Sequence, residues 1–289
     1  MKPTPAAAAI NDRDRDPLPS SRETALAVVS GSVRPPLTLL ASEPLRAASE
    51  YVLHKLVPLS RPVAGDGHPV VIFPGLAAST RSVAPLRDHV QSLGYKALDW
   101  GRGLNTGPRG DVDKWLEGLA KDVDALLKGH AAPASLIGWS LGGLYARELA
   151  KILAPRVRQV ITIGTPFNVP AGGTHVGWLF RLLSGMPAVA NSHMSARLLR
   201  PPPVPTTSIY SRSDGVVAWQ ACMHEGGAPH VEDIEVRGSH IGMVWNRDVL
   251  SVVSDRLALH AGQRRRFTGS DEAMCEPMHR ALCRPAQRF

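Results

Sequence analysis

One stretch of the chain joins a short apolar run to a helical pattern through a turn rich in glycine. It reads ASLI at residues 134–137, GWSLGG at residues 138–143 and LYARELAKI at residues 144–152. The apolar run is typical of a buried strand, and apolar residues recur at helical spacing after the glycines. A strand that passes directly into a helix through a tight turn predicts a βα unit of an α/β protein.

The alternation of strand and helix continues on both sides of this stretch. Strands are predicted at residues 69–73, 95–99, 134–137, 157–163, 206–210 and 231–236, and helices at 80–93, 111–128, 141–152 and 246–259. This order predicts a mostly parallel sheet with helices on both faces.

Ser140 is the candidate nucleophile, because it occupies the centre of a Gly-x-Ser-x-Gly turn between the predicted strand and helix. A serine in this position lies on a strained turn, and the neighbouring backbones are expected to leave no room for side chains at Gly138 and Gly142. A serine hydroxyl is a weak nucleophile until a base accepts its proton. A histidine and an orienting carboxylate are therefore expected later in the chain.

Asp214 and His240 are the candidates for these two roles. Asp214 follows the predicted strand 206–210 and His240 follows the predicted strand 231–236, so both are expected at the carboxyl edge of the sheet. Their order after Ser140 is the order that the turn motif requires. Asp233 is the alternative acid, but it falls in a predicted strand and is expected at the surface.

Two backbone N–H groups are expected to stabilise the negative oxygen of a tetrahedral intermediate. One belongs to Leu141, the residue after the serine, and the other to Leu76, which follows the first predicted strand in the sequence Pro74-Gly75-Leu76. An ordinary tight turn is the alternative interpretation of this second segment.

Residues 167–203 interrupt the alternation of strands and helices with many prolines and glycines. An irregular insertion of this length is typical of a lid or a binding loop. Its apolar cluster consists of Trp178, Leu179, Phe180, Leu182, Leu183 and Met186. The predicted substrate-binding residues are Trp139, Trp178, Phe180 and Leu183, and packing of the cluster on the core is the alternative.

The predicted α/β domain spans residues 63–262, with segments of different character on either side. Residues 1–22 are predicted to be a mobile tail, residues 23–62 a helical extension and residues 263–289 a basic tail. The apolar residues of the extension recur at helical spacing at Leu37, Leu40, Leu45, Ala48, Val52 and Leu56. This apolar face is expected to pack on the domain, and peripheral contact with a membrane surface is the alternative.

Composition and charge exclude several other classes of protein. The chain is 44% hydrophobic and 20% charged, as is usual for a globular protein. Its net charge of +8 would attract anions, but no basic patch interleaved with aromatic residues accompanies it, so nucleic acid is not an expected partner. The three cysteines lack CxxC spacing, and neither a disulfide framework nor a zinc site is indicated. Since the sequence shows neither a signal-peptide core nor an apolar run long enough to cross a bilayer, a cytoplasmic location is expected.

Five ordered motifs within residues 69–259 resemble the bacterial triacylglycerol lipase and esterase branch of the α/β-hydrolase superfamily. They are FPGL at residues 73–76, GWSLGG at 138–143, ITIGTP at 161–166, SDG at 213–215 and GSH at 238–240. The resemblance implies the α/β-hydrolase fold with a lid, and hydrolysis of carboxylic esters through an acyl-enzyme. Pro74 and Trp139 stand where many such lipases have a histidine.

The sequence thus predicts a serine esterase or lipase that acts on a small-molecule or lipid ester with an apolar acyl chain. No metal or organic cofactor is expected, because the serine, histidine and aspartate supply the chemistry. An acyltransferase or thioesterase is an alternative, since an alcohol can intercept the acyl-enzyme and a thioester can form it. A non-catalytic binding protein of the same fold is the other alternative, although it would need neither nucleophile nor base.

Overall fold

The computed structural model describes residues 35–57, 65–168, 192–260, 263 and 265–268. All of these belong to one structural unit, Val33–Phe289. The predicted tail of residues 1–22 lies outside the described residues, and so do residues 269–289 of the basic tail and residues 169–191 of the insertion.

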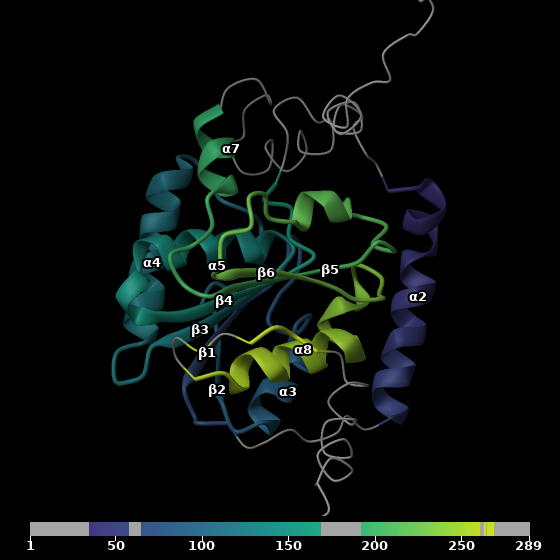
Figure 1. The fold of residues 1–289 in the computed structure, drawn as a ribbon, viewed down its shortest axis with the longest axis horizontal. Helices are drawn as coiled ribbons and strands as arrows, with labels where there is room; N and C mark the ends of the chain where they lie inside the picture. The colour runs from purple at the N-terminus through teal and green to yellow at the C-terminus, as the bar shows by residue number, and fades with distance from the viewer. Residues whose placement is uncertain (1–34, 58–64, 169–191, 261–262, 264, 269–289) are drawn as a thin grey trace, which may run out of the picture. The chain divides into compact units, whose positions relative to one another are not determined.

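A parallel sheet forms the centre of the described part of the chain (Figure 1). Its strands are β1 (Pro69–Phe73), β2 (Lys96–Asp99), β3 (Ala134–Trp139), β4 (Val157–Ile163), β5 (Thr206–Tyr210) and β6 (Val231–Glu235). They lie in the order β2-β1-β3-β4-β5-β6, and every neighbouring pair is parallel. All residues of β1, β3 and β5 are buried, as expected for a sheet covered on both faces.

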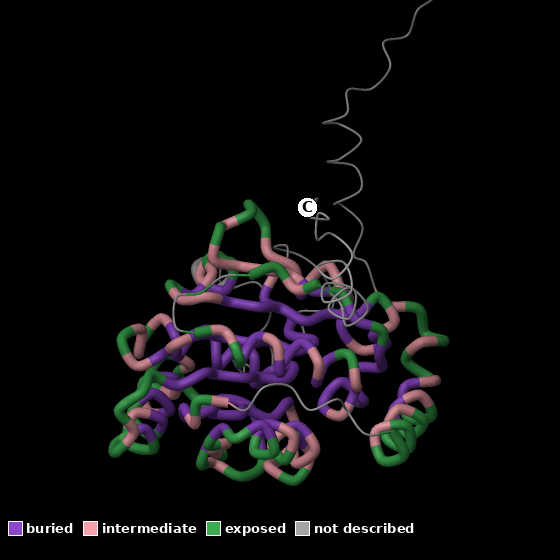
Figure 2. The backbone as a smooth tube through the Cα atoms, turned by 60° about the horizontal axis from the view of Figure 1, so that its bottom comes forward, coloured by how far each residue is buried: buried purple, intermediate pink, exposed green. Residues whose placement is uncertain are grey.

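Helices cover the two faces of this sheet, and the predicted α/β class is confirmed. They are α3 (Ala84–Ser92), α4 (Val112–Leu126), α5 (Leu141–Ile152), α7 (Ser192–Leu199) and α8 (Arg247–Ala258). Helices α4 and α5 share one apolar cluster with Val71 and Phe73, whereas α3 and α8 share the other with Val70 and Ile72. Successive residues of β1 thus point to opposite faces. Figure 2 shows the buried strands in the middle and exposed residues on the outer turns.

Helix α2 (Leu37–Leu56) forms where the sequence predicts it, but the prediction that its apolar face packs on the domain is wrong. Leu37, Leu45 and Leu56 are 80%, 76% and 73% exposed. The buried residues of this helix are Glu43 and Ala47. The helix presents a polar side to the protein because Glu43 has hydrogen-bond partners in the loops that follow β5 and β6.

None of the helices in the described ranges combines the length and the apolar character needed to cross a membrane.

Substitutions in α2 test which side of this helix is buried. Leu45→Gln should change the free energy of unfolding by about 0.5 kcal/mol or less, as is usual for an exposed position. Ala47→Gln should lower it by about 1–3 kcal/mol, because a larger side chain overpacks a buried site. Urea denaturation measures both values, and equal losses from the two substitutions would contradict the orientation described above.

Candidate active site

Ser140 lies at the turn between β3 and α5 in a backbone conformation that is rare for residues other than glycine. Its φ is 53° and its ψ is −123°, and such strain persists only where the surrounding structure holds it. A Cβ atom on Gly138 would collide with the carbonyl oxygen of Gly142, and a Cβ atom on Gly142 would collide with that of Phe73. The tight turn predicted from the glycine pattern is present.

The structure brings Ser140, His240 and Asp214 together in one hydrogen-bonded row at the carboxyl edge of the sheet. Nε2 of His240 lies 3.1 Å from Oγ of Ser140, and Nδ1 of His240 lies 2.6 Å from Oδ2 of Asp214. The other carboxylate oxygen of Asp214 accepts hydrogen bonds from the backbone N–H groups of Val216 and Val217. The row can pass a proton from serine to imidazole while the aspartate fixes the ring.

Contacts between loops hold this row in place. Oγ of Ser211 donates to the carbonyl oxygen of Gly238 at 2.8 Å, which ties the loop of Asp214 to the loop of His240. The indole N–H of Trp139 donates to the carbonyl oxygen of His240 at 3.1 Å. Trp139, a predicted substrate-binding residue, is 9% exposed, and this hydrogen bond supports the backbone of His240. The other predicted substrate-binding residues, Trp178, Phe180 and Leu183, lie outside the described residues.

Two opposing effects act on the pKa of His240. Burial lowers it, because a charged imidazolium loses its hydration, whereas the negative charge of Asp214, its hydrogen bond and the charge of Glu43 raise it. The net result is a pKa above the ordinary value of 6.5. The protonated form of the His240 imidazole is thereby stabilised.

Asp233, the alternative acid, is paired with a different histidine. Its carboxylate accepts a hydrogen bond from the backbone N–H of His224 at 2.8 Å and lies 2.7 Å from Nδ1 of the same residue. The second ring nitrogen of His224, Nε2, lies 2.6 Å from Nη1 of Arg147. The corresponding atom of His240 faces the hydroxyl of Ser140 instead. The sequence predicts Asp233 at the surface, but its side chain is partly buried beside His224, with 16% exposure.

His224 differs from His240 in the direction of its pKa shift. Burial lowers the pKa of His224, its hydrogen bond to Asp233 raises it, and the positive charge of Arg147 lowers it. The net pKa is below the ordinary value of 6.5. An aspartate partner alone therefore does not decide the direction of the pKa shift of a buried histidine, because burial and nearby positive charge act against it.

A second set of the same three residue types lies at the opposite, amino edge of the sheet. Nε2 of His68 lies 2.8 Å from Oγ of Ser135, and Nδ1 of His68 is hydrogen-bonded to the carboxylate of Asp66. Ser135 is completely buried within β3, and its hydroxyl also accepts a hydrogen bond from Gln159. Because no substrate can reach this hydroxyl, the set is a structural network.

The two predicted N–H donors lie at the start of α5 and in the loop after β1, where Gly75 approaches the side chain of Ser140. Leu141 is the first residue of α5, and Leu76 lies in the loop after β1. Among the described residues, neither backbone N–H has a hydrogen-bond partner. Asn105 braces the loop of Leu76, since its Nδ2 donates to the carbonyl oxygen of Pro74 and its own carbonyl accepts from Ala77, each at 2.8 Å. Sequence reasoning missed Asn105, because its role depends on a partner about thirty residues away, which no local pattern encodes.

Several solved structures resemble this arrangement of sheet and helices. The Pyrococcus furiosus esterase PF2001 aligns with a TM-score of 0.54 and 17% sequence identity, over 68% of this chain and 84% of that chain. The Bacillus licheniformis lipase BlEst2 aligns with a TM-score of 0.52 and 16% identity, over 70% of this chain and 96% of that chain. The chain has the α/β-hydrolase fold. At these identities, the likeness concerns the fold alone.

Comparison of the sequence alone finds a shorter match within this fold. No protein-family model matches the chain. The pimeloyl-(acyl-carrier protein) methyl ester esterase of Shewanella sp. (strain MR-7) is 33% identical over 104 residues, which are 35% of this chain and 36% of that relative. The enzyme of the same description from Shewanella woodyi is 31% identical over 102 residues, 37% of its length. The chain therefore matches little more than a third of the length of these curated relatives.

The two histidine pKa shifts predict titrations on opposite sides of pH 6.5. The pKa of His240 should lie above this value and the pKa of His224 below it. Asp214→Asn should lower the pKa of His240, because a negative partner is removed, and should leave His224 unchanged. Nuclear magnetic resonance of isotope-labelled imidazole nitrogens measures both residues in one sample. A lower pKa for His240 than for His224 would contradict the charge arrangement described above.

Proposed function

We propose that this chain is a serine hydrolase that cleaves carboxylic esters, with Ser140, His240 and Asp214 as its catalytic triad. The observation that carries the proposal is the hydrogen-bonded row of these residues at the strained turn after β3. The α/β-hydrolase fold supports it, because this fold presents such a serine at the carboxyl edge of its sheet. The esterase descriptions of the sequence relatives are consistent with the same reaction.

The proposed reaction has two steps. In the first, Oγ of Ser140 attacks the ester carbonyl while its proton passes to Nε2 of His240, which then protonates the leaving alcohol. In the second, His240 removes a proton from water, the resulting hydroxide attacks the acyl-enzyme, and the acid leaves as Ser140 recovers its proton. Asp214 stabilises the imidazolium in both steps, and the N–H groups of Leu76 and Leu141 stabilise the oxyanion.

We further propose an apolar acyl group for the substrate. The support comes from the sequence of the insertion at residues 167–203, whose cluster around Trp178 and Phe180 would suit an alkyl chain. Its last part, α7, packs on α5, because the Arg147 guanidinium donates to the Leu198 carbonyl and Leu198 is buried. The insertion is thus tied to the helix that begins immediately after Ser140.

Ser140→Ala should lower kcat/KM for p-nitrophenyl esters by at least about a thousandfold and abolish labelling by a fluorophosphonate. The assay runs from acetate to palmitate, with emulsified triglyceride beside it, so that esterase and lipase activity are separated. Ser135→Ala is the matched control, since it removes a serine that also contacts a histidine but is completely buried. Retained labelling of the Ser140→Ala protein would refute the proposed nucleophile.

Asp214→Asn should lower kcat by about four orders of magnitude, because asparagine stabilises the wrong tautomer of the catalytic histidine. Asp233→Asn should leave kcat close to that of the wild type and lower the melting temperature instead, since its partner is His224. The two variants are compared by steady-state kinetics and thermal unfolding. If only the Asp233→Asn protein lost most of its kcat, Asp233 and not Asp214 would be the catalytic acid.

A further inference from the structure

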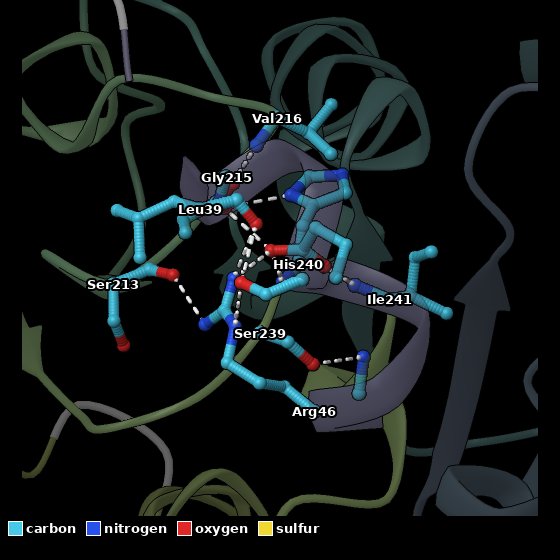
Figure 3. A network of polar contacts seen from close by, with 12 residues as sticks. Leu39, Arg46, Ser213, Gly215, Val216, Ser239, His240 and Ile241 are labelled. Atoms are coloured by element: carbon cyan, nitrogen blue, oxygen red, sulfur yellow. Dashed lines mark hydrogen bonds and ion pairs between the residues drawn. The ribbon is translucent and has the colours of Figure 1, made fainter. Parts of the chain in front are cut away.

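An acidic side chain of the N-terminal helix reaches both loops that carry Asp214 and His240. Glu43 of α2 is 2% exposed. Its Oε1 atom accepts hydrogen bonds from the backbone N–H groups of Gly215, at 2.8 Å, and of His240, at 3.0 Å. Its Oε2 atom accepts from the N–H of Ile241 at 3.1 Å. Figure 3 shows how Gly215, His240 and Ile241 converge on this part of the helix.

Arg46, one turn further along α2, extends the contact to the other neighbour of Asp214. Its Nη2 atom donates to Oε1 of Glu43 at 2.8 Å, and its Nη1 atom donates to the carbonyl oxygen of Ser213 at 2.6 Å. Ser213 precedes Asp214 and Gly215 follows it. The helix therefore holds the backbone of the proposed catalytic acid on both sides.

The packing between α2 and this loop leaves no space for adjustment. A Cβ atom on Gly215 would collide with the backbone of Leu39 and Leu40. The glycine lets the helix backbone lie directly against the residue that follows Asp214. The position of the helix thus limits the position of the carboxylate.

Glu50, two turns after Glu43 on the same helix, makes a comparable but narrower contact. Its Oε1 atom accepts from the N–H of Ser239 at 2.8 Å, and its Oε2 atom accepts from Nδ2 of Asn246 at 3.0 Å. Both partners belong to the chain around His240. Glu50 therefore supports the loop of the histidine, whereas Glu43 joins that loop to the loop of the aspartate.

Burial of a carboxylate is costly unless hydrogen bonds replace its hydration, and Glu43 has three backbone N–H groups and a guanidinium around it. The charge also acts on its neighbour. Burial lowers the pKa of His240, Asp214 raises it through its charge and hydrogen bond, and the charge of Glu43 adds to that increase. Two other charged side chains of α2 lie nearby: Arg46 forms an ion pair with Glu43, and Glu50 accepts a hydrogen bond from the backbone N–H of Ser239.

We propose that Glu43 is a positioning residue for the catalytic row, because one oxygen of its carboxylate binds the backbone of the His240 loop and of the Asp214 loop together. A single acceptor shared by two N–H groups sets the separation of the two loops from which the aspartate and the histidine project. This inference rests on the proposed ester hydrolysis. If Glu43 positions these loops, helix α2 is part of the proposed catalytic site.

Two substitutions separate the position of the Glu43 carboxylate from its charge. Glu43→Gln keeps the length of the side chain but removes the charge and places an NH2 group among N–H donors. Glu43→Asp keeps the charge but is one methylene too short to reach both loops. Both should lower kcat/KM by about ten- to a hundredfold, as small misplacements of catalytic groups do.

The pH profile of kcat/KM distinguishes a positioning role from general support of the fold. His240 must be neutral to accept a proton, so activity rises as the pH passes its pKa. Because the charge of Glu43 raises that pKa, Glu43→Gln should shift the acidic limb to lower pH, and Glu43→Asp should leave it near that of the wild type. Glu50→Gln is the matched control and should leave the limb in place, since Glu50 has no share in the shift of His240.

A melting temperature that falls while kcat/KM stays within about twofold of the wild type in both Glu43 variants would overturn the proposal. If Glu43→Gln does not yield folded protein, the rate of the Glu43→Asp protein decides the question. Failure of the proposed function gives a different result: wild-type protein that neither hydrolyses esters nor reacts with a fluorophosphonate. In that case, imidazole titration of His240 in the Glu43→Gln protein still tests the charge contact.

Discussion

The close approach of the turn after β3 to the end of β1 is the constraint on which the rest of the site depends. Ser140 adopts a positive φ, and the neighbouring glycines lie against carbonyl oxygens with no space for a Cβ atom. Such a conformation costs about 1–3 kcal/mol and persists only where the surroundings determine it. Helix α5 supplies those surroundings, because it is buried from Leu141 to Ala150.

The two buried aspartate–histidine pairs show that local charge gives similar groups different properties. His240 and His224 each face a carboxylate, yet the pKa of the first is raised and that of the second is lowered. At His224, burial and the charge of Arg147 outweigh Asp233, whereas at His240 the charge of Glu43 adds to the effect of Asp214. Only the environment of His240, which faces Ser140, favours the protonated imidazole.

Helix α2 shows why an amphipathic pattern does not decide which side of a helix faces the protein. Its leucines recur at helical spacing, but Leu37, Leu45 and Leu56 are exposed. The inner side carries carboxylates that accept hydrogen bonds from backbone N–H groups of the two loops that follow β5 and β6. Hydrogen-bonding demand at the site thus outweighs the gain from burying the leucines.

Local pattern determined most of the fold and the choice of the candidate catalytic residues. Strands 157–163 and 206–210 form with the predicted bounds, because β-branched and apolar runs between turn residues have few other stable conformations. Ser140, Asp214 and His240 could be named because each follows a strand of a parallel sheet. The partners of Asn105 and Glu43 could not, since they lie far from these residues in the sequence. Only the tertiary structure decided them, because a hydrogen bond between distant segments exists only once the strands and α2 have packed.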